Sequence, residues 1–154
     1  MQSRRQLLLA AAASSLAGPG IAQADEPDRQ LGRLLDAVFA ETLEDSPELV
    51  TSLGLDKGAQ SDAKSKLRDA SLAGMERRKA RNTDQLRRLK AIDRRPLTGM
   101  AAVNYDTLLF DLQSADDANR AFVYGNGAGN PYVLAQISGA WQNVPSFLES
   151  QHSI

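Results

Sequence analysis

The chain reads DRQLGRLLDAVFAETLE from Asp28 to Glu44, and this stretch sets the class of the fold. Its large apolar side chains recur every three or four residues, which is the spacing of one face of an α-helix. The pattern therefore predicts a helix over residues 28–44 whose apolar face packs on a core. The apolar positions on that face are Leu31, Leu34, Leu35, Val38, Phe39 and Leu43.

A second, short helix is expected directly after the first. Pro47 is well suited to the first helical position, and Ser46 before it is a suitable N-cap. This helix should end near Gly54, because glycine commonly follows the last turn. Residues 55–60 are expected to form a loop.

The next segment is rich in Ala, Leu, Lys and Arg and contains no proline over residues 61–93. This composition predicts one long helix, or two helices joined near Asn82. Pro96 prevents continuation, and Thr98 can cap a following helix. The long helix has a thin apolar seam of Leu67, Ser71, Met75, Leu86 and Leu89, and the core face of the following helix consists of Val103, Leu108, Leu109 and Leu112.

The remainder of the chain is less regular. Residues 114–130 are polar and then glycine-rich, which predicts a loop. Asn130 and Pro131 resemble a helix start, and Gly139 and Pro145 are expected to divide the last segment into two short helices. No stretch alternates as a β-strand does. We therefore expect an all-α fold in which several helices form a partial helical lobe.

Composition limits the possible functions. The chain has 154 residues, a formal net charge of −1 and no cysteine. This length suits one domain, and disulfides, thiolate zinc sites and cysteine nucleophiles are excluded. Charge is segregated: residues 25–62 carry an excess of acids, 63–95 an excess of bases, and 96–154 again an excess of acids. The basic segment is therefore expected to pack between the two acidic ones, or beside the rest of a larger protein.

Residues 1–24 resemble an export leader. Arg4 and Arg5 precede a short apolar stretch, and Ala22 and Ala24 fit a small-x-small cleavage site. The paired arginines favour a twin-arginine leader, with an ordinary Sec leader as the alternative. The apolar stretch is too short for a stable membrane anchor. The mature chain is thus expected to begin at Asp25 and to be periplasmic or secreted.

Two motifs suggest phosphate binding at first sight. The basic run from Arg77 to Arg95 could contact nucleic acid, but no aromatic residue is interleaved for stacking. The glycine-rich residues 125–129 lack the spacing of a dinucleotide loop and the Lys-Ser/Thr of a P-loop. We therefore expect no nucleic-acid partner, a solvated basic face and a flexible connection.

No catalytic or metal-ligating set is recognisable. His152 is the only histidine, whereas a catalytic zinc needs about three protein ligands. There is also no G-x-S-x-G nucleophile elbow. Large apolar residues and hydrogen-bonding residues alternate after Gly129, which suits the wall of a cleft. The candidate substrate-cleft residues are Tyr132, Gln136, Trp141 and Gln142, and plain core packing is the alternative for the Tyr and the Trp.

Several motifs carry a resemblance to a known family. The block NPYVLAQISGAWQ at 130–142, followed by VPSFL at 144–148, resembles the bacterial domain of unknown function 885 family. EDSPELVTSLG at 44–54 resembles its "P-x-x-A-T-x-L-G" segment, with Val50 where Ala is usual. NYDTL at 104–108 and FLESQH at 147–152 resemble its "N-Y-D-x-L" and "F-L-x-x-x-H" motifs. The resemblance runs from about Pro27 to the last residue.

The resemblance implies a function that these residues do not provide alone. Family members are commonly exported and are similar to zinc metallopeptidases of the H-E-x-x-H class, whose zinc motif lies downstream of anything present here. Residues 25–154 are then expected to be the N-terminal, scaffold portion of a peptidase-like hydrolase. That portion would hold no zinc itself, lack a C-terminal metal-binding portion and be inactive alone on a peptide-like substrate. The alternative is a stand-alone periplasmic helical binding or interaction module.

Overall fold

The computed structural model describes residues 25–122, Gln136 and residues 139–150. These residues form six helices and no strand, which confirms the all-α class. The described helices are α2 (Glu26–Asp45), α3 (Pro47–Ser52), the 3-10 helix η1 (Gly58–Ser65), α4 (Leu72–Lys90), α5 (Gly99–Ala121) and α6 (Ala140–Ser150).

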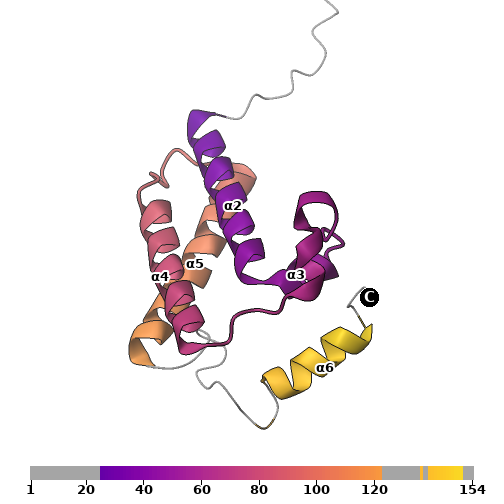
Figure 1. Ribbon diagram of the computed structural model, residues 1–154. Helices are drawn as coiled ribbons and strands as arrows, with labels where there is room; N and C mark the ends of the chain where they lie inside the picture. Colours follow the sequence, from indigo (N-terminus) through magenta and orange to yellow (C-terminus); the bar gives the residue numbers. More distant parts are fainter. Residues whose placement is uncertain (1–24, 123–135, 137–138, 151–154) are drawn as a thin grey trace, which may run out of the picture.

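Helices α2, α4 and α5 pack against one another as a bundle (Figure 1). Leu31 and Leu89 are the most completely buried apolar side chains of its core. Burial of one such leucine contributes about 1.5–3 kcal/mol relative to its exposure. Most of the apolar face predicted for the first helix therefore does face a core, but Phe39, which was expected on that face, is 50% exposed. The core consists of Leu31, Leu34, Leu86, Leu89, Ile92, Leu97, Tyr105 and Leu112.

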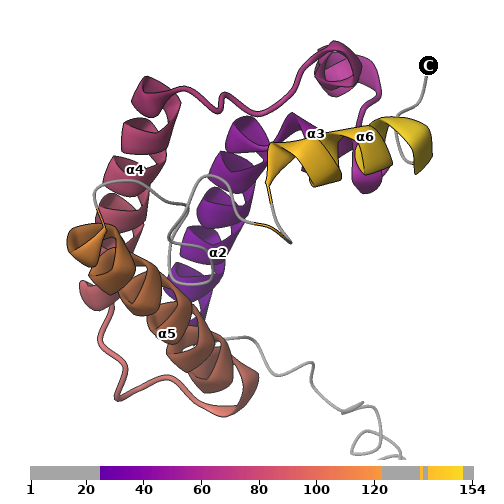
Figure 2. The ribbon, with the colours of Figure 1, turned by 90° about the horizontal axis from the view of Figure 1, so that it is seen from below.

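A smaller apolar cluster joins α3 and η1 to the bundle. Leu43 of α2 packs with Val50 of α3 and Ala63 of η1. Helix α6 stands apart from α4 and α5 in both views (Figures 1 and 2). Within the described part of the chain, no helix is long and apolar enough to cross a membrane.

The end of α2 depends on a residue of α4. The last turn of α2 contains no basic side chain, although cations there stabilise the exposed carbonyls. Arg81 supplies this charge from α4: its guanidinium donates to the Glu41 carbonyl at 2.6 Å and lies 3.1 Å from an Asp45 carboxylate oxygen. The two helices therefore stabilise each other electrostatically as well as through the core.

The predicted helix over residues 61–93 is wrong in its first third. The chain forms η1 up to Ser65, then runs without helix to the N-cap residue Ser71. Ser71 accepts a hydrogen bond from the Gly74 amide at 3.1 Å and donates its own amide to Asp69 at 2.9 Å. Short polar side chains that bond nearby amides in this way compete with helix and favour a helix start.

Three smaller corrections concern the same region. The break lies before α4 rather than near Asn82, which is inside α4. Leu67 is 46% exposed and belongs to no apolar seam. The predicted loop over residues 55–60 is wrong from Gly58, where η1 begins.

The predicted loop over residues 114–130 is also wrong at its start, because α5 continues to Ala121. The reason is Asp116, which is only 2% exposed and accepts a hydrogen bond from Thr83 of α4 at 2.8 Å. An Arg120 nitrogen lies 2.6 Å from the other oxygen of the same carboxylate. A polar segment that looks like a loop is thus held in the bundle by its partners.

The remaining helix-end predictions have mixed outcomes. Ser46 and Thr98 occupy the N-cap positions of α3 and α5, but neither side chain makes a capping hydrogen bond. Gly139 precedes α6 with a φ of 145°, as expected of a break. Pro145 does not divide the segment, since α6 runs through it. The expected start at Asn130 and Pro131 lies outside the described residues.

Asp69 lies so close to α4 that position 74 has no room for a side chain. A Cβ at Gly74 would lie 2.6 Å from both the Asp69 carboxyl carbon and its carbonyl oxygen. We expect Gly74→Ala to destabilise the protein by about 1–3 kcal/mol, because one of these groups must move. Gly32→Ala is the matched control, since nothing lies within 4 Å of its Cβ position, and it should stabilise by about 1 kcal/mol. Equal unfolding midpoints for the two variants would contradict the clash.

Candidate functional site

A cavity of about 230 Å³ lies between the C-terminal end of α2, the segment before α4, and the facing sides of α4 and α5. Its wall combines cationic side chains with neutral hydrogen-bonding groups. Such a lining suits a small polar molecule better than an apolar one. The lining residues are Thr42, Asp45, Ser46, Arg68, Met75, Arg78, Lys79, Arg81, Asn82, Gln85, Ala115 and Asn119.

Positive charge dominates this wall, because four of its residues are Arg or Lys and one is Asp. Arg81 is already committed to α2, with carboxylate oxygens of Asp45 and Glu44 at 3.1 and 3.3 Å. Lys79 lies 3.3 Å from a carboxylate oxygen of Glu76. The acid in the wall is therefore neutralised by Arg81, Lys79 is paired with Glu76, and the charges of Arg68 and Arg78 remain.

Arg78 is held in place but is only partly neutralised. One of its guanidinium nitrogens donates to the Asp69 carbonyl oxygen at 2.7 Å. Burial, followed by the positive charge of Arg68, lowers the pKa of Arg78, whereas the charges of Asp45 and Asp69 act in the opposite direction. An arginine stays protonated despite such a shift. The lowered pKa thus reflects burial of the guanidinium first and the nearby positive charge of Arg68 second.

Arg68 completes the pair from the non-helical segment. Its backbone amide donates to a Glu48 carboxylate oxygen at 2.9 Å, which ties this segment to α3. Its guanidinium makes no hydrogen bond or ion pair with any residue that the structure describes. No described residue therefore occupies the side-chain donors of Arg68, which lines the cavity.

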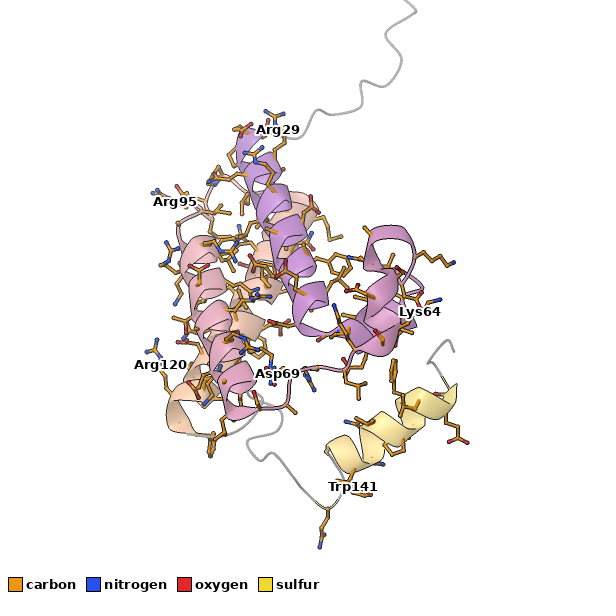
Figure 3. The ribbon with its side chains drawn as sticks, viewed as in Figure 1. Arg29, Lys64, Asp69, Arg95, Arg120 and Trp141 are labelled. Carbon is orange, nitrogen blue, oxygen red and sulfur yellow. The ribbon has the colours of Figure 1, made fainter. Side chains whose placement is uncertain are left out.

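Asp69 fixes the geometry between these two arginines. Figure 3 shows it where the chain enters α4. Hydrogen bonds from Ser71 and Arg77 hold the pKa of the Asp69 carboxyl well below its usual range. Its carboxylate is thus occupied by Ser71 and Arg77, and only its carbonyl serves Arg78.

Most of the other bases between 77 and 95 are paired within the protein. Helix α4 packs against both α2 and α5, so the basic segment does lie between the acidic ones. This neutralisation agrees with the absence of a nucleic-acid partner, which stays a prediction. The pairs are Arg77–Asp69, Arg87–Asp84, Arg88–Glu41, Arg94–Asp106 and Arg95–Asp93.

The candidate cleft residues that the structure describes, Gln136, Trp141 and Gln142, are not among the residues that line this cavity. Gln136 is exposed, and so are Trp141 and Gln142 on α6; the indole of Trp141 is 53% exposed (Figure 3). Tyr132 and His152 lie outside the described residues. The role of Tyr132, Gln136, Trp141 and Gln142 in a substrate cleft stays a prediction.

The part of the chain that the structure describes contains no candidate metal site. No group of three or more His, Cys, Asp or Glu side chains there could hold a metal ion. The described residues therefore do not fit zinc.

Helix α5 carries a second surface of interest. Its buried residues Tyr105 and Leu112 lie on one side, as the core requires. Met100, Val103 and Phe110 recur at helical spacing on the other side and are 70%, 55% and 72% exposed. Val103 was expected in the core, and Tyr105 takes that place because it lies on the face toward α4. We name Met100, Val103 and Phe110 the outer stripe of α5.

The larger part of the chain matches the model of one protein family. Residues 47–154 match the model of a family described as "Bacterial protein of unknown function (DUF885)". No curated protein and no solved structure matches the chain. The match begins at α3, so helix α2, which was expected to belong to the resemblance, lies before it.

The contact between α2 and α4 predicts a pH dependence of stability. Burial alone would raise the pKa of Glu41, but hydrogen bonds from Arg88 at 2.6 and 2.8 Å and from Gln85 at 2.8 Å lower it from 4.5. A lowered pKa in the folded state means that the stabilisation is present above about pH 4.5 and is lost as the pH falls through the folded pKa.

We therefore expect Glu41→Gln to destabilise the protein at neutral pH by about 1–3 kcal/mol. The difference from the parent should shrink as the pH is lowered from 4.5, which denaturant unfolding at several pH values would measure. Glu44→Gln is the control, since this side chain is exposed, and it should cost about 0–1 kcal/mol. A Glu41→Gln effect that stays constant down to acid pH would contradict the assignment.

Proposed function

Because this chain belongs to the DUF885 family of bacterial proteins, we propose that it is the exported, helical scaffold portion of a zinc-dependent, peptidase-like hydrolase. The chemistry that zinc would supply in the complete enzyme is metal-assisted hydrolysis of a peptide-like bond. Residues outside these 154 would hold the metal. The leader-like residues 1–24 support placement in the periplasm or outside the cell.

The NYDTL motif at 104–108 has a structural role, which supports a scaffold. Tyr105 is buried in the bundle core. Asp106 accepts two hydrogen bonds from Arg94, at 2.7 and 2.8 Å. Arg94 also donates to the Leu97 carbonyl. Tyr105 and Asp106 of the motif thus fix the connection between α4 and α5.

The observation that carries the proposal is the outer stripe of α5. Three large apolar side chains on one helix face are rarely left in water without a partner. Their burial would contribute about 25 cal/mol per Å² of apolar surface. A metal-bearing portion packed on α5 would cover the stripe and would be held by the rigid bundle behind it.

The stand-alone binding module remains the second candidate, and the cavity favours it. Arg68 and Arg78 present donors to a cavity that none of the family motifs explains. A module of this kind would bind a ligand with these 154 residues alone. Ligand binding and peptide hydrolysis can be measured separately.

The scaffold role predicts that the full chain supplied with zinc does not hydrolyse peptides, because the described residues offer no metal site. A broad mixture of peptides followed by mass spectrometry would detect cleavage. A zinc-dependent turnover that His152→Ala abolishes would contradict the proposal.

The outer stripe predicts that the protein self-associates and binds apolar dyes through a surface that includes Phe110. We expect Phe110→Ser to reduce self-association and the fluorescence of an apolar dye, because it removes the most exposed side chain of the stripe. Phe39→Ser is the matched control, since Phe39 is half exposed on α2. Analytical ultracentrifugation and dye titration would measure both. Equal effects of the two substitutions would show that the stripe has no special role.

A further inference from the structure

We propose that the cavity between α2, α4 and α5 is a binding site for a small molecule with an oxyanion group, a carboxylate or a phosphate, which Arg68 and Arg78 hold together. This site is independent of the scaffold role and requires no metal. Neither the family description nor the sequence motifs assign it.

The donors required for such a ligand are present and available. A guanidinium offers five N–H groups in a planar fork that matches carboxylate and phosphate oxygens. The guanidinium of Arg78 donates one hydrogen bond, to the backbone carbonyl oxygen of Asp69. Arg68 uses none of its side-chain donors on the residues that the structure describes. Two guanidinium groups can therefore bind one anion from two directions.

The protein holds both arginines where an anion would be stabilised. The Glu48 carboxylate fixes the backbone of Arg68, and the Asp69 carbonyl fixes the side chain of Arg78. Arg68 repels the charge on Arg78, as the lowered pKa of Arg78 records alongside its burial. An anion between them would replace this repulsion by two attractive contacts, and its hydrogen bonds would be charge-assisted.

The rest of the wall favours a small ligand over a polymer. Asp45 is the acidic residue of the wall, and Arg81 pairs with it at 3.1 Å. Asn82, Asn119 and Ser46 add neutral hydrogen-bonding groups. A cavity of about 230 Å³ holds a molecule with few heavy atoms, and an extended nucleic-acid strand does not fit inside it.

The test is calorimetric titration of the full chain with inorganic phosphate and, separately, with succinate at low ionic strength. We expect saturable binding of at least one of them. Arg68→Gln and Arg78→Gln should each weaken it roughly tenfold or more, since each removes charged hydrogen bonds. Binding of phosphate alone would identify a phosphate site, and binding of succinate alone a carboxylate site.

Arg95→Gln is the matched control, because Arg95 pairs with Asp93 away from the cavity and is fully solvated. It should bind as the parent does. Arg68 is exposed outside the helices, so Arg68→Gln keeps the test valid even if Arg78→Gln unfolds, which circular dichroism would reveal. The proposal is overturned if neither anion binds saturably, or if Arg95→Gln loses as much affinity as Arg68→Gln.

Discussion

The arrangement of the bundle depends on one carboxylate, that of Glu41 in α2. It accepts hydrogen bonds from Arg88 and Gln85, one turn apart on α4. The side chains of Arg88 and Glu41 are both largely shielded from water. A charged hydrogen bond contributes more in such a place than on an open surface. Because the apolar face of α4 is thin, this contact sets the register of α4 on α2 in a way that leucine packing alone would not.

That register also produces the cavity. With Glu41 holding α4, Arg81 reaches the end of α2 and neutralises Asp45. Arg78, which is three residues earlier in α4, then faces the segment that contains Arg68. The site is therefore a consequence of how the charges of two helices are matched. Arg81 and Arg88 pair with the acids at the C-terminal end of α2, and among the described residues the guanidinium groups of Arg68 and Arg78 form no ion pair with a carboxylate.

Local sequence predicted the parts of the fold that local forces determine. Helix α2 follows from its apolar period, and α3 from Pro47, since both signals act within a few residues. The end of α5 could not be predicted in this way, because Asp116 looks like a loop residue until Thr83, 33 positions earlier, bonds to it. The arginine pair was hidden for the same reason. Arg78 belongs to a basic run whose pattern is typical of a solvated helix face. Contacts between helices decide which arginine of that run is left without a carboxylate partner, and the sequence pattern does not show these contacts.

The Arg81 contact with α2 has a consequence for assembly. A helix whose last carbonyls are stabilised by a distant side chain is less stable as an isolated peptide than inside the bundle. The C-terminal turns of α2 should therefore become ordered only when α4 docks. Helix formation and docking are then a single cooperative event, and during synthesis the C-terminal end of α2 would be completed only after α4 has been made.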